Sequence, residues 1–155
     1  MKTITFYSYK GGVGRSLVLA NLANRLVEFG KSVVMLDFDL EAPGLPFKFD
    51  AKKILAQKKK GLVDFVIEYQ KDSLHRPPVI LGNDYFIPLN ADRANQSPLY
   101  LITAGNTDSQ EYWKNLAAID WKEMFYSKSG NGYKLMLHLK ALIEKEIEEL
   151  AYQWE

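Results

Sequence analysis

The sequence predicts an α/β fold, with a parallel sheet flanked by helices in a single domain over residues 1–155. Two observations lead to this prediction. With 47% apolar and 25% charged residues, a chain of 155 residues can build one hydrophobic core but is cramped for two domains. In addition, strand-like and helix-like patterns alternate over the first 37 residues, which is typical of a βαβ unit.

The first unit consists of a strand, a helix and a second strand. Residues 3–9 mix β-branched, aromatic and small side chains and lead into a glycine cluster, which predicts a strand followed by a tight loop. From Ser16 onward apolar residues recur at helical spacing, and Gly30 suits a left-handed C-terminal cap. Residues 32–36 are an apolar run typical of a parallel strand buried on both faces. We therefore expect a ligand site at the carboxyl ends of these strands.

The remaining chain predicts more helix than strand. The expected elements, in order, are helices over 51–60 (closed by Gly61) and 62–69, a β-hairpin with strands 79–81 and 85–87 around a turn at 82–84, a buried strand over 99–103, a short helix over 111–118 and a long helix over 133–154.

The charge and residue composition exclude several kinds of site. The 20 basic and 19 acidic residues give a net charge of +1, so nucleic acid is a conceivable partner that the sequence does not indicate. The absence of cysteine excludes disulfides, zinc–thiolate sites, iron–sulfur clusters and thiol nucleophiles within this sequence. No apolar run is long enough for a signal peptide or a membrane span. We expect a cytoplasmic protein.

The strongest motif is a glycine-rich loop, Lys10-Gly11-Gly12-Val13-Gly14-Arg15-Ser16, placed between the first expected strand and the first expected helix. Glycines let successive backbone N–H groups turn inward, and the helix contributes its positive end, so the loop can hold phosphate oxygens. The spacing departs from the common phosphate loop G-x-x-x-x-G-K-[ST], because the first glycine is missing and Arg15 stands where lysine is usual.

This loop resembles the deviant Walker A family of P-loop ATPases, typified by MinD, ParA and nitrogenase iron protein, whose loop reads K-G-G-x-G-K-[ST]. It is most similar to the branch with arginine in the loop, the KGGVGR-motif variant ATPases. The stretches 7–16 (YSYKGGVGRS), 37–45 (DFDLEAPGL) and 101–105 (LITAG) fit that branch in order. The implied fold is a P-loop NTPase-like parallel sheet, and the implied chemistry is Mg²⁺-dependent ATP hydrolysis coupled to dimerisation and partner switching.

The resemblance also implies a role for each matching residue. Lys10 would reach across a dimer to the partner's phosphates, and Asp39 would orient the attacking water, so these are the implied catalytic residues. Arg15 would be the cation at the β- and γ-phosphates. The implied ATP-binding set is Lys10, Gly11, Gly12, Val13, Gly14, Arg15, Ser16 and Leu17, and the implied Mg²⁺ set is Ser16, Asp37 and Asp39. Phosphoryl transfer depends mainly on positioning and charge neutralisation, which these residue types can supply.

One part of the family pattern is absent. After a helix like that over 133–154, family members continue into the Walker B strand and a loop of the D-S-R-T-G kind, which this sequence lacks. We therefore expect half a family domain, truncated before that strand. Three explanations stay open: a fragment, one half of a split protein, or a self-sufficient chain that oligomerises. The expected partners are ATP and either a second copy or a chain that supplies the strand.

The missing motif leaves two functions open. The first is an ATP-binding, hydrolysing switch, although arginine binds phosphate with a larger, planar group than lysine, so good binding with weak hydrolysis is consistent with the loop. The alternative is a non-hydrolysing, degenerate P-loop module that acts through oligomerisation or a partner chain. The sequence names neither the partner nor the cellular process.

Overall fold

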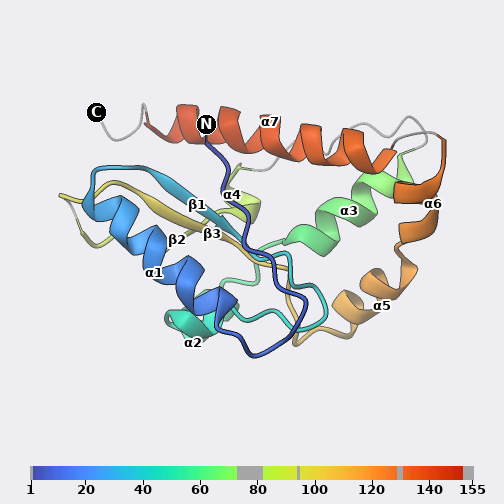
Figure 1. The fold of residues 1–155 in the computed structure, drawn as a ribbon, viewed down its shortest axis with the longest axis horizontal. Helices are drawn as coiled ribbons and strands as arrows, with labels where there is room; N and C mark the ends of the chain where they lie inside the picture. Colours follow the sequence, from blue (N-terminus) through green and yellow to red (C-terminus); the bar gives the residue numbers. More distant parts are fainter. Residues whose placement is uncertain (1, 73–81, 94, 129–130, 152–155) are drawn as a thin grey trace.

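The computed structural model describes residues 2–72, 82–93, 95–128 and 131–151 (Figure 1). Within them lies a three-stranded sheet in the order β1-β3-β2. Strand β1 (Val33–Leu36) runs parallel to β3 (Leu99–Ile102), with Val33 opposite Leu99, and β2 (Ile87–Pro88) pairs antiparallel with β3. The sheet is therefore mostly parallel, as expected, with one antiparallel edge strand.

Helices surround this sheet. Their bounds are α1 Arg15–Glu28, the 3₁₀ turn η1 Pro46–Lys48, α2 Ala51–Ala56, α3 Leu62–Lys71, α4 Gly82–Tyr85, α5 Gln110–Ala118, α6 Trp121–Tyr126 and α7 Asn131–Ala151. None of these described helices has the length and apolar character needed to cross a membrane.

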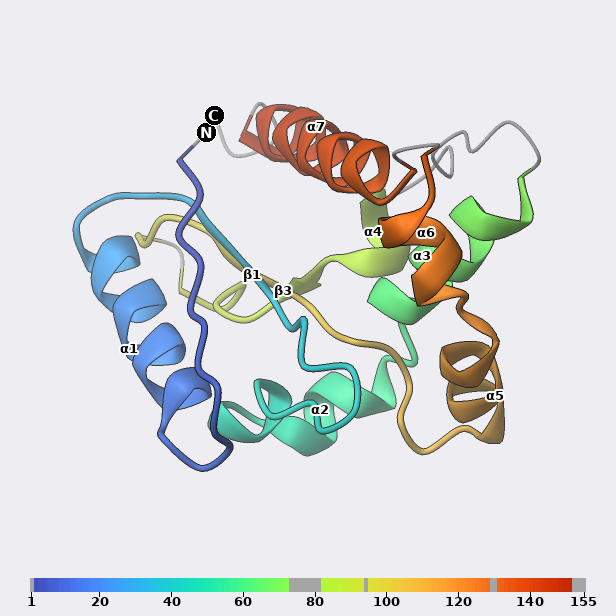
Figure 2. The ribbon, with the colours of Figure 1, turned by 45° about the vertical axis from the view of Figure 1, so that its right-hand side comes forward.

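Helices cover both faces of the sheet (Figures 1 and 2). Met35 and Leu101 face a cluster that contains Ala23 and Val27 of α1. Tyr100 and Ile102 face the larger cluster, to which α3, α5, α6 and α7 contribute. Alternate residues of β1 and β3 thus serve opposite layers, because successive strand side chains point to opposite faces. The apolar runs in the sequence reflect burial on both sides.

Helix α1 confirms the sequence prediction closely. It spans Arg15–Glu28, and Gly30 adopts the expected left-handed conformation at φ 73°. The Lys31 N–H donates to the Leu26 carbonyl at 3.0 Å and the Gly30 N–H to the Val27 carbonyl at 2.9 Å. This pairing is the Schellman arrangement, which satisfies carbonyls at a helix end.

The predicted strand over residues 3–9 is wrong. Residues 2–8 have no regular structure, and most of them are exposed, Tyr7 at 79% of its surface. This segment runs past the sheet without joining it (Figures 1 and 2). Strand-forming composition is not sufficient, because a strand also needs a paired neighbour for its backbone groups. In the described part of the chain, β1 pairs with β3 alone.

The predicted hairpin is also corrected. Its first strand, 79–81, lies outside the described residues, and its turn, 82–84, belongs to helix α4. The strand that follows, β2, pairs with the distant β3. The helix expected over 51–60 ends at Ala56, and Gly61 is the N-cap of α3 rather than the end of α2.

Four other predicted elements, one strand and three helices, are confirmed with small shifts at their ends. The strand over 99–103, the helices over 62–69 and 111–118, and the long helix over 133–154 appear as β3, α3, α5 and α7; residues 152–154 of the last one lie outside the described residues. Helix α6 was not predicted, although its start carries a recognisable signal. The Asp120 side chain accepts from the Glu123 N–H at 2.8 Å, which is an N-cap interaction.

A close contact between two backbone segments fixes α3 against the end of β3. The N–H groups of Leu62 and Val63 donate to the carbonyls of Thr103 and Ala104, both at 3.0 Å. A Cβ placed at Gly61 would lie 2.3 Å from the Gly105 nitrogen and 2.5 Å from the Ala104 carbonyl carbon. Because these neighbours are backbone atoms, the contact requires glycine at position 61.

We predict that Gly61→Ala lowers the free energy of unfolding by about 2 kcal/mol or more, because the methyl group forces α3 away from β3. Urea denaturation measures this change. Gly11→Ala is the matched control, since a Cβ there meets no atom within 4 Å. Equal midpoints for the two variants would contradict the close-contact argument.

Candidate functional site

The glycine-rich loop forms an open turn at the start of α1. Gly12 and Gly14 have φ angles of 73° and 81°, a region that glycine enters without steric cost. Helix α1 begins at Arg15, and its N-cap, Gly14, supplies no capping side chain. Backbone N–H groups of the first turn therefore have no side-chain cap, and together with the helix dipole they favour an anion.

Ser8 shapes the entry to this loop. Its Oγ donates to the Lys10 carbonyl at 2.6 Å, and the Lys10 N–H donates back to the same Oγ at 3.2 Å. The hydroxyl thus closes a local turn of the kind that serine side chains form with nearby backbone. Lys10 itself is exposed.

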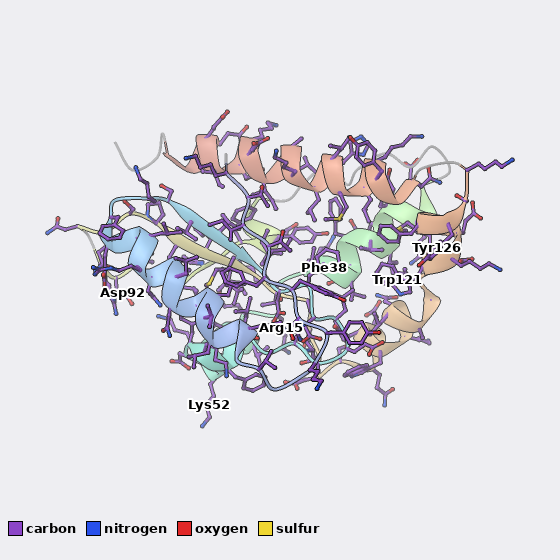
Figure 3. The ribbon with its side chains drawn as sticks, in the orientation of Figure 1. Arg15, Phe38, Lys52, Asp92, Trp121 and Tyr126 are labelled. Atoms are coloured by element: carbon purple, nitrogen blue, oxygen red, sulfur yellow. The ribbon has the colours of Figure 1, made fainter. Side chains whose placement is uncertain are left out.

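Arg15 connects the loop to the carboxyl end of β1. Its Nη2 donates to Asp39 Oδ2 at 3.1 Å, and its Nη1 donates to the Ser8 carbonyl at 3.0 Å. The side chains of Arg15 and Asp39 are 33% and 41% exposed. The structure therefore brings together the two oppositely charged residues that the sequence singled out, 24 positions apart. Figure 3 places Arg15 at the start of α1.

Asp37 holds the segment that follows β1. Its side chain is buried, with 3% of the residue exposed. Its Oδ2 accepts from the Leu45 N–H at 2.9 Å, and its Oδ1 accepts from the Asp39 N–H at 3.3 Å. Burial raises the pKa of this carboxyl above its usual value, and the backbone N–H donors partly oppose that shift. The carboxylate organises residues 37–45 into a compact loop.

This loop lies directly beside the glycine-rich loop. A Cβ placed at Gly44 would lie 3.3 Å from Ser16 Oγ, so the two segments are nearly in contact. Ser16 is half-buried there, whereas Gly11, Gly12, Val13, Gly14 and Leu17 are exposed. The expected phosphate-binding residues and the expected Mg²⁺ residues thus lie at one edge of the sheet.

Three neighbouring residues belong to this region and were not assigned to the site from sequence. Ser8 contributes its carbonyl to Arg15, and Gly44 makes room for Ser16. The third is Tyr112 of α5, whose hydroxyl donates to the Leu40 carbonyl at 2.5 Å. Burial raises the pKa of Tyr112 to about 12, which keeps that donor protonated. Ser8 and Gly44 lie within conspicuous motifs, but no local signal links Tyr112 to Leu40.

The donor set fits Mg²⁺. A hydroxyl and two carboxylates are oxygen ligands, and Mg²⁺ is commonly held by one or two carboxylates together with waters and substrate phosphates. The described residues contain no group of three or more histidine, cysteine, aspartate or glutamate side chains that could hold a metal alone. Any Mg²⁺ here would therefore depend on phosphate oxygens as well.

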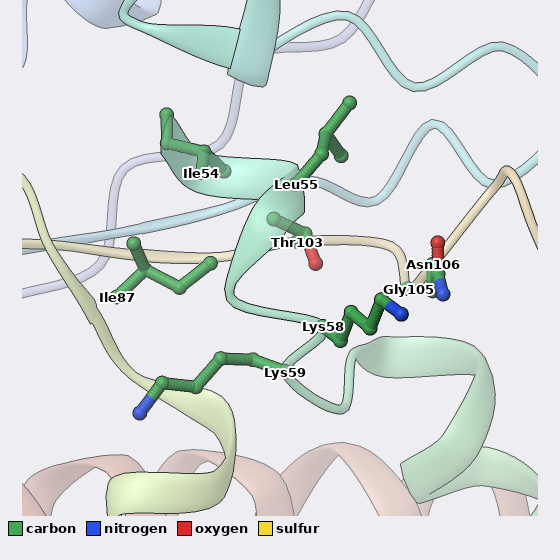
Figure 4. A pocket seen from close by; sticks show the side chains of 8 residues that line it. All are labelled: Ile54, Leu55, Lys58, Lys59, Ile87, Thr103, Gly105 and Asn106. Carbon is green, nitrogen blue, oxygen red and sulfur yellow. The ribbon is translucent and has the colours of Figure 1, made fainter. Parts of the chain in front are cut away.

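A hollow lies away from the glycine-rich loop, between α2 and the segment after β3. It has a volume of about 530 Å³ and is lined by Phe47, Lys52, Leu55, Lys58, Asn106 and other residues. A much smaller hollow of about 10 Å³ shares Leu55, Lys58 and Asn106 with it. Lys58 points toward Gly105 and Asn106, whereas Lys59 points the other way (Figure 4). None of the predicted phosphate-binding residues lines either hollow, so both are separate from the glycine-rich loop.

The lysines of the 52–60 stretch are mostly solvent-facing, as expected. Lys60 pairs with Glu68 at 2.7 Å and Lys53 with Asp92 at 3.5 Å, both on the surface. Lys52 points away from the protein in Figure 3. Exposed pairs of this kind contribute little to stability.

Comparison with known proteins finds similarity in the N-terminal part of the chain. The ParA family model, described as that of the NUBPL iron-transfer P-loop NTPase, matches residues 1–71. The N-terminal region of this chain belongs to the MinD/ParA-like P-loop family. It is an ATP-binding family, and the matched region contains the glycine-rich loop, Arg15 and the 37–45 segment.

Three curated proteins are similar to parts of this chain. The septum site-determining protein MinD of Helicobacter pylori is 57% identical over 37 residues, covering 24% of this chain and 14% of the relative. An uncharacterized ATP-binding protein of Methanocaldococcus jannaschii is 31% identical over 81 residues, covering 51% and 29%. The iron–sulfur cluster carrier protein of Aquifex aeolicus is 35% identical over 85 residues, covering 48% and 23%.

These matches span less than a third of each relative's length. No solved structure gives a significant match.

The buried Asp37 gives a prediction about pH. Because burial raises the folded pKa of Asp37 above the usual aspartate value, the folded state binds this proton more tightly than the unfolded state. Ionisation of Asp37 therefore lowers the free energy of unfolding as the pH rises from the usual aspartate pKa through the raised folded pKa. Asp37→Asn keeps one acceptor but cannot ionise, so relative to the natural chain it gains stability over that rise. Urea denaturation of both proteins from pH 3.5 to pH 7 measures the difference.

A constant difference between the two proteins across this range would contradict the argument. Asp50→Asn is the control for a generic charge effect, because Asp50 is an exposed carboxylate that likewise caps a backbone N–H.

Proposed function

We propose that this chain binds ATP with Mg²⁺ at the 10–17 loop and acts as a ParA/MinD-type, dimerisation-coupled ATPase in the cytoplasm. The observation that carries the proposal is the arrangement of the loop. The loop has an uncapped helix start and two glycines with positive φ. The Arg15 guanidinium beside it contacts Asp39, which follows β1 together with Asp37. Family membership of residues 1–71 supports the same ligand.

In this proposal the loop and Arg15 hold the phosphates. The backbone N–H groups of residues 11–17 surround the phosphate oxygens, and Arg15 neutralises charge at the β- and γ-phosphates with a bidentate guanidinium. Lys10 is exposed at the mouth of the loop, where it is available to the phosphates of a second copy. The likeness to the deviant Walker A pattern supports this role for Lys10.

Ser16, Asp37 and Asp39 would hold Mg²⁺. When bound, the ion neutralises charge that develops on the phosphate oxygens. Asp39 would orient the attacking water. Asp37 accepts two backbone N–H groups, which keeps its oxygens fixed at the edge of the sheet. Because arginine positions its charge differently from lysine, we propose slow hydrolysis relative to binding.

We predict that Arg15→Ala weakens ADP binding in the presence of Mg²⁺ by more than tenfold, because the variant lacks the charge-assisted hydrogen bonds to phosphate. Titration calorimetry measures the dissociation constants. Arg25→Ala is the matched control, since Arg25 lies on the same helix and pairs with the exposed Glu28. An affinity unchanged by Arg15→Ala would remove Arg15 from the site.

We predict that Lys10→Ala lowers both ATP-dependent dimer formation and phosphate release, while binding to the single chain persists. The reason is that Lys10 acts on the partner's phosphates in this proposal. Light scattering with and without ATP and Mg²⁺ measures the mass, and a coupled assay measures phosphate. Lys31→Ala controls for removal of an exposed lysine near α1. Dimers that form equally well without Lys10 would contradict the model.

A further inference from the structure

Both terminal nitrogens of Arg15 donate hydrogen bonds within the chain. Nη1 donates to the Ser8 carbonyl at 3.0 Å and Nη2 to Asp39 Oδ2 at 3.1 Å. A guanidinium grips phosphate through the same fork of N–H groups. The carboxylate of Asp39 and a bound phosphate therefore compete for the same guanidinium charge.

Hydrogen bonds within the 37–45 segment fix the position of Asp39. Its backbone N–H donates to Asp37 Oδ1 at 3.3 Å, and the buried Asp37 is anchored to the Leu45 N–H at 2.9 Å. The pair joins two segments far apart in sequence, the glycine-rich loop and the segment after β1. Both side chains are partly exposed, at 33% and 41%, so an anion from solvent can reach the pair.

We propose that Asp39 acts as an internal competitor that holds Arg15 until a phosphate ligand displaces it. The inference rests on the proposed function of the loop as a nucleotide site and adds a regulatory step to it. Binding breaks the Arg15–Asp39 contact, transfers the guanidinium to phosphate and releases the Asp39 carboxylate for its role toward water. In this proposal Arg15 and Asp39 stay paired until phosphate binds, so neither side chain is available for phosphate binding or hydrolysis before then.

This device has a measurable consequence. A phosphate that takes the Arg15 guanidinium from Asp39 must open the pair, so the pair weakens the observed affinity. Partly exposed ion pairs contribute up to about 1 kcal/mol, so removing the carboxylate should tighten binding about two- to fivefold. The effect must disappear when Arg15 is absent, because Asp39 then has no guanidinium to hold.

The experiment is a double-mutant cycle read by titration calorimetry with ADP. It compares the natural chain, Asp39→Asn, Arg15→Ala and the double variant. EDTA is present throughout, so that any metal contact of Asp39 does not enter the comparison. Glu41→Gln is the matched control, because Glu41 is an exposed carboxylate in the same segment. Circular dichroism and thermal melts verify that each variant is folded.

The expected result is tighter ADP binding by Asp39→Asn, a smaller change for Glu41→Gln, and no gain from Asp39→Asn when Arg15 is alanine. An equal gain in the Arg15→Ala background would overturn the proposal, because it would show simple repulsion between Asp39 and phosphate. Unchanged affinity of Asp39→Asn in a chain that binds ADP would overturn it as well, and would leave the nucleotide site intact.

Two further outcomes separate this proposal from the proposed function. Binding by Asp39→Asn but not by the natural chain would support both. If no folded variant binds ADP in EDTA or with Mg²⁺, the nucleotide site is wrong and the competitor fails with it.

Discussion

The site depends on the parallel pairing of β1 with β3. Because the two strands run in the same direction, their carboxyl ends leave the sheet at one edge. The Asp37 N–H donates to the Ile102 carbonyl at 3.0 Å, which starts the 37–45 segment from a fixed point. The carbonyls of Thr103 and Ala104, directly after the end of β3, accept hydrogen bonds from the first N–H groups of α3. The backbone of β3 and the residues after it thus anchor both the 37–45 segment and helix α3.

The buried Asp37 holds the 37–45 segment next to the glycine-rich loop. A carboxylate removed from water is costly unless donors surround it, and two backbone N–H groups supply part of that compensation. In satisfying them, residues 37–45 fold back so that Gly44 lies against Ser16 and Asp39 reaches Arg15. A residue that is unfavourable for packing therefore positions the two segments that would share a phosphate ligand.

Much of this arrangement could be predicted from local sequence. Apolar runs predicted β1 and β3, helical spacing and Gly30 predicted α1, and the glycine cluster predicted the tight loop before that helix. Pairing was harder, because residues 3–9 have strand-like composition and yet join no strand in the described part of the chain. Position 82–84 has turn-like residues but forms α4. Composition reports local preference, whereas pairing depends on neighbours that are distant in sequence.

The edge position of β1 has a consequence for the exchange of its amide hydrogens with solvent. The N–H groups of Val33 and Asp37 point toward β3, where they donate to Pro98 and Ile102. Because strand residues alternate, the Val34 and Leu36 amides point away from β3, on the side where no described strand pairs with β1. Neighbouring amides in this one strand should therefore differ sharply in protection, and any polypeptide that pairs with that edge would slow the exchange of Val34 and Leu36 selectively.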